Sequence, residues 1–266
     1  MKGEFQLKSP VVVLWTNRAY LVTLATIGTV IAFLLILTYV SVKVNAPLSE
    51  AVCGKTIIVD PGHGGDDAGA KGRSGLLEKD VVLDIGLRLA GLFNRAAVYT
   101  VLTRNTDEGL IEPGSHSPAN WKRLDLEGRV ELVALHNADL YVSIHANSFP
   151  EQVWSGAQTF YYSKSDEAKE LAIAIQKELV SRLGPNLRKA KAGDDYFVLR
   201  KSTVPAVIVE VGFLSNPREE ALLAQADYRR QVAEAVFHGT VNYLVDSYKR
   251  RRRSEERRVG KECRSR

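Results

Sequence analysis

Two histidines follow apolar runs that are typical of buried strands. His63 comes after residues 56–60 (TIIVD) and a Pro-Gly break, and His145 directly follows residues 140–144 (LYVSI). Open α/β sheets bind their ligands at the carboxyl ends of their strands. Because imidazole is the commonest metal ligand in proteins, the pair indicates a metal site at this edge of a sheet. Either histidine alone would fit a solvated or structural role equally well.

Two glutamates occupy positions that invite a chemical role. Glu210 lies in the run 206–211 (AVIVEV), which is otherwise apolar on both faces. A carboxylate inside a buried strand is costly unless it is paired, hydrogen-bonded or protonated, so Glu210 is either a reactive acid or part of a buried ion pair. Glu78 lies in the first turn of a predicted helix. There it either complements the helix dipole or points back toward His63 as a ligand.

These residues together predict a catalytic zinc centre. Two histidines and one carboxylate, with water in the fourth position, form a catalytic zinc arrangement, whereas closed structural sites usually use cysteines. We predict that His63, Glu78 and His145 bind Zn²⁺ and that Glu210 is the general base and acid. Zinc acidifies an attacking water, and desolvation would raise the pKa of Glu210 into the range that suits a proton shuttle. Asn147 is a candidate substrate contact, or it simply makes a turn.

The elements that must position these residues alternate between strand and helix. This order predicts an α/β fold with a mostly parallel or mixed central sheet and helices on both faces. The stretch 108–122 is rich in glycine, proline and serine and is expected to be a loop at the same rim. Apolar patterning predicts further strands at 98–103, 157–162 and 196–199, and helices at 77–92, 125–136, 165–183, 218–226 and 228–248.

The amino-terminal part of the chain predicts a membrane anchor. Residues 19–42 carry no charge, and about 20 apolar residues suffice for a helix to span a bilayer. Basic residues on the amino side predict that this end stays in the cytoplasm. A cleaved signal peptide with a site near residues 44–46 is the alternative, although signal cores are shorter. The predicted organisation is a cytoplasmic segment (1–18), an anchor (19–42), a linker (43–53), an extracytoplasmic catalytic domain (54–248) and a basic tail (249–266).

The charge of the chain does not indicate a nucleic-acid partner. The formal charge is +5, but residues 253–266 alone contribute +3, so the remainder is close to neutral. That segment, RSEERRVGKECRSR, resembles a translated sequencing adapter, and a genuine solvated basic tail is the alternative. If it is an artefact, Cys53 is the only native cysteine and Cys263 has no structural meaning. No intrachain disulfide is then implied.

Four segments resemble one family of bacterial cell-wall enzymes. IIVDPGHGG, LLEKD, ADLYVSIHANS and PAVIVEVGFLSNPREEALL are similar to the zinc-dependent N-acetylmuramoyl-L-alanine amidases. The resemblance extends from about Lys55 to Tyr248. It implies that the residues matching His63, Glu78 and His145 hold zinc and that the one matching Glu210 is catalytic. It also implies peptidoglycan as the substrate, cut at the amide between the lactyl group of muramic acid and L-alanine.

Within that family, the anchor and the single catalytic domain resemble the spore-cortex, germination-related amidases. Those enzymes remove stem peptides ahead of muramic δ-lactam formation. One alternative is another zinc peptidase that cuts an ordinary peptide bond. A second is an inactive peptidoglycan-binding module, which would require the loss of a site residue, and none is lost. The family also allows a partner protein that activates the enzyme or loads its metal, although the sequence does not show one.

Overall fold

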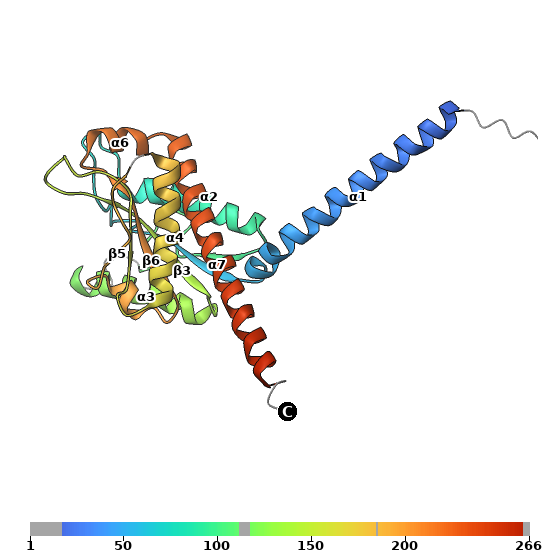
Figure 1. Ribbon diagram of the computed structural model, residues 1–266. Helices are drawn as coiled ribbons and strands as arrows, with labels where there is room; N and C mark the ends of the chain where they lie inside the picture. Colours follow the sequence, from blue (N-terminus) through green and yellow to red (C-terminus); the bar gives the residue numbers. More distant parts are fainter. Residues whose placement is uncertain (1–17, 112–117, 185, 263–266) are drawn as a thin grey trace, which may run out of the picture. The chain divides into compact units, whose positions relative to one another are not determined.

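The computed structural model of the chain describes residues 18–111, 118–184 and 186–262. Residues 1–17 of the predicted cytoplasmic segment, and Cys263 with the three residues after it, lie outside the described residues. The chain divides into two compact units after Pro47, and the second unit contains the sheet (Figure 1).

The first unit consists mainly of helix α1 (Arg18–Val52), which includes the predicted anchor at 19–42. Side chains between Leu21 and Ile36 are exposed. Within the described residues, no helix combines the length and the apolar character needed to cross a membrane. The predicted linker is helical as far as Val52. Ala51 and Val52 belong to the second unit and are buried in its core.

A six-stranded mixed sheet in the order β2-β1-β3-β6-β4-β5 organises the second unit. The first four strands in this order are parallel, β4 is antiparallel to β6, and β5 is parallel to β4. The prediction of a mostly parallel or mixed sheet is thereby confirmed. The strands are β1 (Thr56–Pro61), β2 (Tyr99–Leu102), β3 (Leu140–Asn147), β4 (Gln158–Tyr161), β5 (Lys191–Ala192) and β6 (Ala206–Phe213).

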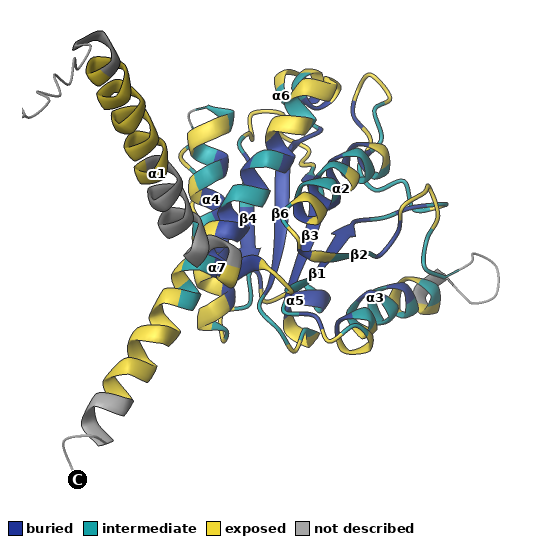
Figure 2. Cartoon of the chain, turned by 90° about the vertical axis from the view of Figure 1, so that its right-hand side faces the viewer, coloured by how far each residue is buried: buried dark blue, intermediate teal, exposed yellow. Residues whose placement is uncertain are grey.

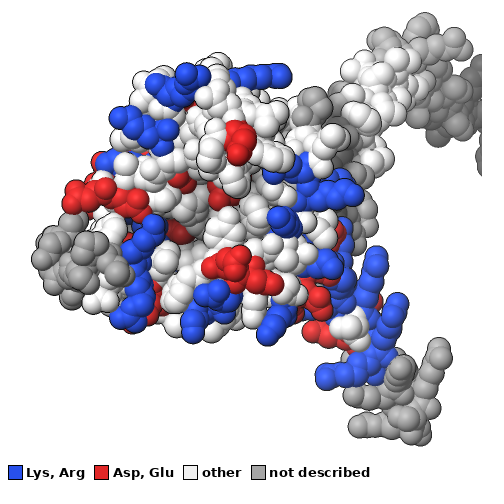
Figure 3. Space-filling view, turned by 90° about the vertical axis from the view of Figure 1, so that its left-hand side faces the viewer, with Lys and Arg blue, Asp and Glu red and all other residues white. Residues whose placement is uncertain are grey.

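Helices cover both faces of this sheet, so that its strands are buried between them (Figure 2). The larger core lies under α2, α4 and α7, and the smaller one lies under α3 and α5. Helix α7 continues past the predicted end at 248, and basic side chains gather near its carboxyl end (Figure 3). The helices are α2 (Glu78–Arg95), α3 (Pro118–Leu135), α4 (Asp166–Leu183), α5 (Phe197–Lys201), α6 (Pro217–Leu223) and α7 (Ala226–Glu262).

Alternation along the strands decides which side chains meet at the site. In β1, Ile57 and Val59 enter the larger core, whereas Ile58 enters the smaller one. In β6, Val209 enters the larger core and Ile208 enters the smaller one. Successive strand residues point to opposite faces of a sheet. Asp60 and Glu210 lie two positions after Ile58 and Ile208, so they also lie on the α3 and α5 side of the sheet. The carboxyl end of that face therefore carries the chemistry.

Two predicted elements differ from the structure. The stretch 108–122 is not a loop throughout, since α3 begins at Pro118, where a proline fits the first turn of a helix. Residues 196–199 form no strand, because Tyr196 precedes the short helix α5. A run of four apolar residues is too short for its periodicity to separate helix from strand, which explains that error.

Candidate metal centre

The turn after β1 brings His63 against His145. Gly62 makes this approach possible, because a Cβ atom added there would lie 2.2 Å from Cε1 of His145. His63 itself has a φ of 62°, a left-handed conformation that is uncommon for residues other than glycine. The two imidazole rings meet edge to face, with centroids 4.9 Å apart and planes at 78°. The histidines that end two separate strands thus share one site.

Glu78 lies between the two imidazoles. Its Oε1 is 3.0 Å from Nε2 of His63 and 3.0 Å from Nδ1 of His145. The backbone N–H groups of Ala146 and Ala70 donate to its two oxygens at 2.9 and 2.8 Å, which fixes the carboxylate. One nitrogen from each histidine and one oxygen from Glu78 lie within 4.8 Å of one another. The three residues predicted as metal ligands therefore converge.

The electrostatics of this cluster fit a bound cation. Burial opposes ionisation of Glu78, but hydrogen bonds with His145 and His63 hold its pKa well below the usual range. Burial also disfavours the charged form of His63 and would lower its pKa, but hydrogen bonds to Asp67 and Glu78 raise that pKa to about 9. The cluster thus stabilises a positive charge between its members. Two imidazoles and a carboxylate form the donor set that zinc prefers in catalytic sites.

Asp67 orients His63 from the other side of its ring. The Oδ2 atom of Asp67 lies 2.9 Å from Nδ1 of His63, which leaves Nε2 facing Glu78. A carboxylate on the outer nitrogen of a metal-binding histidine fixes both the tautomer and the orientation of the ring. The predictions from sequence did not include this role, and the spacing of four residues between His63 and Asp67 was the only available signal.

Glu210 lies beside the cluster on the neighbouring strand. It pairs directly with His145 across β3 and β6, so both side chains lie on the same face of the sheet. Its Oε1 lies 3.4 Å from the hydroxyl of Tyr196, and among the described residues its buried Oε2 has no hydrogen-bond partner. Burial raises the pKa of Glu210 to about 7, although the charge of His145 opposes this shift. Glu210 can therefore take up and release a proton near neutral pH.

A buried polar network, which the sequence did not predict, underlies the site. The carboxylate of Asp60 in β1 accepts hydrogen bonds from Thr103, Tyr141 and Ser143 at 2.6–2.7 Å. It also forms an ion pair of 2.6 Å with Arg129 of α3. Although burial opposes ionisation, the charge of Arg129 holds the pKa of Asp60 well below its usual range.

Arg129 connects this network to the turn that carries His63, one of the predicted metal ligands. Its guanidinium donates to the backbone oxygen of His63 at 2.8 Å and to that of Pro61 at 3.1 Å. A second ion pair of 2.6 Å joins it to Asp125. The turn that carries His63 is consequently anchored to a helix that begins more than 50 residues later in the chain. No local sequence pattern marks such a contact.

An open cavity of about 360 Å³ lies beside the cluster. Both histidines line it, together with Trp121, Tyr196 and Phe197. Asn147 does not line it. Its side-chain oxygen accepts the N–H of Ser148 at 2.8 Å, which is the turn-making role that the sequence also allowed. Its contact with substrate stays a prediction.

Comparisons with known sequences agree with this geometry. Residues 57–242 match the family Amidase_3, described as N-acetylmuramoyl-L-alanine amidase. The chain is 40% identical over 200 residues to the germination-specific N-acetylmuramoyl-L-alanine amidase of Bacillus subtilis, covering 75% of this chain and 84% of the relative. It is 37% identical over 206 residues to the amidase LytC of the same organism. That match covers 77% of this chain but only 38% of LytC.

Solved structures give the same assignment. The CwlD amidase of Clostridioides difficile, solved in complex with the GerS lipoprotein, matches with a TM-score of 0.70 and 37% identity over 72% of this chain and 98% of CwlD. The amidase AmiC2 of Nostoc punctiforme matches with a TM-score of 0.62 and 36% identity over 71% of this chain and 97% of its own. Since the family match spans more than half of the sequence, this chain belongs to the N-acetylmuramoyl-L-alanine amidase family and hydrolyses the amide bond of peptidoglycan for which that family is named.

Proposed function

We propose that His63, Glu78 and His145 hold a zinc ion and that Glu210 is the general base and acid of the amidase. One observation carries this proposal, namely three converging donor atoms beside a buried glutamate with an unpartnered oxygen. A bound zinc ion would act as a Lewis acid and make an attacking water a stronger nucleophile at neutral pH. The remaining steps depend on residues of the chain.

Glu210 moves the proton. It accepts a proton from the attacking water and delivers it to the nitrogen of L-alanine, so that the amide C–N bond breaks and a free amine leaves. A pKa of about 7 suits both halves of this transfer. Burial raises the pKa of Tyr196 above its ordinary value, so its hydroxyl stays protonated and can donate to Glu210 as the carboxylate forms. Asp67 keeps His63 in its ligating orientation.

In the cell, we propose that the enzyme removes stem peptides from spore-cortex peptidoglycan ahead of δ-lactam formation. The 40% identity to a germination-specific amidase supports this role. CwlD has been solved with the lipoprotein GerS, which supports a protein partner that assists activity or metal binding here too. Loss of δ-lactam from the cortex of a deletion strain, measured by muropeptide analysis, is the expected result. An unchanged cortex would contradict the role but not the chemistry.

We also propose that residues 19–42 anchor the enzyme, with its catalytic domain outside the cytoplasm. The support is the uncharged run and the basic residues before it. The protein should then stay with membranes during alkaline carbonate extraction and be cut by protease added to intact protoplasts. Release by carbonate, or protection from the protease, would contradict this placement.

Metal analysis combined with muropeptide digestion tests the chemistry. The full chain should bind about one zinc ion and release peptides with a free L-alanine amine and an intact disaccharide. His63→Ala should lose both properties, whereas His136→Ala removes a histidine outside the cluster and should keep them. A new cut within the peptide would instead indicate another zinc peptidase. Binding to peptidoglycan without any cleavage would indicate an inactive module.

A further inference from the structure

We infer that Arg188, with the rings of Phe213 and Trp154, forms a subsite that binds a carboxylate in the peptide portion of the substrate. This inference rests on the proposed function and adds to it the part of the substrate that is held beside Glu210. Three observations carry it. They are the hydrogen bond that joins Arg188 to the row of side chains beside Glu210, the way its guanidinium is fixed, and the absence of an ion-paired carboxylate among the described residues.

The register of the sheet places Gln158, a hydrogen-bond partner of Arg188, on the same face as the reacting centre. Glu210 pairs with His145 of β3 on one side and with Gln158 of β4 on the other. Directly paired residues of neighbouring strands lie on one face, so these three side chains form a row. At about 4.8 Å per strand, the row is about 10 Å long. Arg188 extends it, because its Nη1 donates to Oε1 of Gln158 at 3.0 Å.

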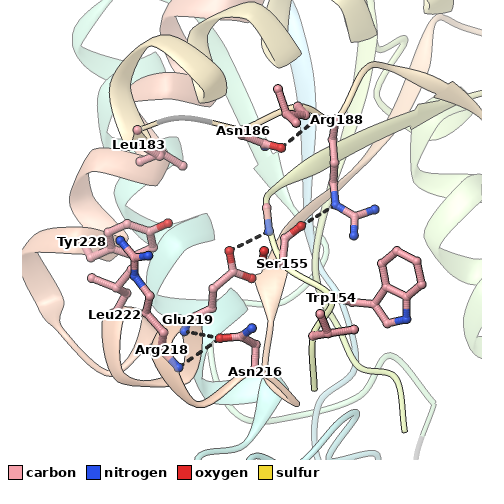
Figure 4. A pocket seen from close by; sticks show the side chains of 14 residues that line it. Trp154, Ser155, Leu183, Asn186, Arg188, Asn216, Arg218, Glu219, Leu222 and Tyr228 are labelled. Atoms are coloured by element: carbon pink, nitrogen blue, oxygen red, sulfur yellow. Dashed lines mark hydrogen bonds between the residues drawn. The ribbon is translucent and has the colours of Figure 1, made fainter. Parts of the chain in front are cut away.

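The guanidinium of Arg188 is held in one orientation. Its Nε donates to the backbone oxygen of Ser155 at 2.6 Å. Its Cζ lies 4.5 Å from the ring centroid of Phe213 and 5.9 Å from that of Trp154. Arg188 lines a second pocket, which shares no lining residue with the cavity beside the metal cluster. Its guanidinium turns toward Trp154 and away from Leu183 at the other end of this second pocket (Figure 4). An arginine fixed in this way loses little entropy when it binds a ligand.

Arg188 has one acidic neighbour, Glu219, whose charge opposes the lowering of the Arg188 pKa by burial but which forms no direct ion pair with it. No described carboxylate lies within 4.0 Å of it, and its hydrogen bonds go to uncharged oxygens. The neighbouring acid, Glu219, is occupied elsewhere, since it accepts the backbone N–H groups of Gly156 at 2.6 Å and Phe213 at 2.7 Å. No described group accepts a hydrogen bond from Nη2 of Arg188. An arginine fork with a free nitrogen beside aromatic rings suits a carboxylate.

The chemistry of the substrate indicates which part binds there. N-acetylated disaccharides carry no charge, and the lactyl carboxyl is consumed in the scissile amide. The peptide that begins with L-alanine continues with an acidic residue, the γ-linked D-glutamate. An extended chain advances about 3.3–3.6 Å per residue, so carboxylates of its second and third residues lie about 7–10 Å from the scissile bond. This distance is comparable with the two strand spacings from His145 to Gln158, beyond which Arg188 lies.

Two matched substrates test the subsite with the zinc-loaded full chain. One is a muropeptide with D-glutamate in its free acid form, and the other carries D-isoglutamine, in which the same carboxyl is an amide. We expect kcat/KM to favour the acid by about 10- to 100-fold, the effect of a hydrogen bond to a charged group. Arg188→Gln should reduce that preference to within about threefold by slowing cleavage of the acid alone. Arg188→Lys keeps the positive charge but lacks the planar guanidinium, so it should keep part of the preference for the acid.

Arg230→Gln is the control for net charge. It removes an arginine that pairs with Glu234 on α7 and does not line the pocket of Arg188, so the preference should persist. Equal cleavage of both substrates by the unaltered chain would overturn the subsite while leaving the amidase intact. An equal loss on both substrates in Arg188→Gln would overturn it too, because Arg188 would then only hold its loop. Cleavage of neither substrate by the unaltered chain would reject the proposed function itself, and the subsite with it.

Discussion

Asp60 and Glu210 are two buried carboxylates on the same face of one sheet, separated only by strand β3. Asp60 is 1% exposed and Glu210 is 7% exposed, so burial alone does not distinguish them. Their partners do. Asp60 receives hydrogen bonds from four side chains, one of them an arginine. Glu210 has one long contact with Tyr196, and its second oxygen has no partner among the described residues.

The difference in partners shows how two carboxylates on one sheet can have opposite roles. The pKa of Asp60 falls well below its usual range because the charge of Arg129 and three hydroxyl groups outweigh burial. The pKa of Glu210 rises to about 7 because little offsets its burial. A carboxylate that stays ionised is a fixed structural anion, whereas one that titrates near neutrality can transfer a proton. We therefore assign Asp60 to the architecture of the site and Glu210 to its chemistry.

The largest effect on activity should come from Glu210→Gln. The substitution preserves shape but removes the proton acceptor, so turnover of muropeptides should fall by about 10²- to 10⁴-fold. Zinc content should be unchanged, because the three proposed ligands remain. Turnover and metal content are measured on the same preparation. Near-full activity would show that Glu210 is not the proton shuttle, and the contrast with Asp60 would lose its meaning.

The matching substitution at Asp60 should affect stability. Asp60→Asn leaves Arg129 buried with one of its two ion pairs broken, which should reduce the free energy of unfolding by about 3–5 kcal/mol. Urea denaturation measures this loss. Asp84→Asn is the control, because Asp84 pairs with Arg88 and Arg229 at a partly exposed site on α2, where ion pairs contribute about 1 kcal/mol or less. Equal losses in the two variants would contradict the role that we assign to the buried network.

The same contrast explains which residues the sequence could reveal. His63, His145 and Glu210 stand at strand ends or inside an apolar run, and such positions follow from local patterning. Glu78 was found because the helix after a strand packs back onto it. Arg129 could not be found in this way, because its contact with Asp60 depends on how α3 crosses the sheet.

The sequence led to wrong predictions for two other parts of the site. The start of α3 at Pro118 lies in a stretch whose glycines and prolines predict a loop, so Trp121 was not expected on a helix. Tyr196 was assigned to a strand and is instead the residue before α5, which brings its hydroxyl toward Glu210. The sheet and its order of elements thus follow from periodicity, whereas the partners of each carboxylate follow from the tertiary arrangement.

The pH dependence of folding should separate the two carboxylates further. In metal-free protein, the folded pKa of Glu210 lies above its unfolded value of about 4.3, so its contribution to stability is present at low pH and is lost as pH rises through about 7. Relative to the unaltered chain, the free energy of unfolding of Glu210→Gln should therefore increase by about 3 kcal/mol between pH 4 and pH 8. Urea titrations with a chelator present measure this difference. Parallel curves for the two proteins would show that folding does not shift the pKa of Glu210.

The smallest effects should come from removing one hydroxyl beside each carboxylate. The Tyr141 hydroxyl is fully buried and donates to Asp60 at 2.6 Å, so Tyr141→Phe should cost about 1.5–3 kcal/mol of unfolding free energy. The Tyr196 hydroxyl lies 3.4 Å from Glu210, so Tyr196→Phe should cost about 0.5 kcal/mol or less. Each is measured by urea denaturation at pH 7.

The effects of the two tyrosine substitutions on kcat should rank in the opposite order to their effects on stability. Tyr196→Phe should lower kcat by a few-fold, because the hydroxyl supports Glu210 only while that carboxylate is ionised. Tyr141→Phe should leave kcat unchanged in the fraction that is folded, because Asp60 stays ionised through Arg129 and does not transfer a proton. If Tyr141→Phe instead lowered kcat and Tyr196→Phe did not, the proton would have to travel through the Asp60 network. The division between an anchoring carboxylate and a reactive one would then be assigned the wrong way round.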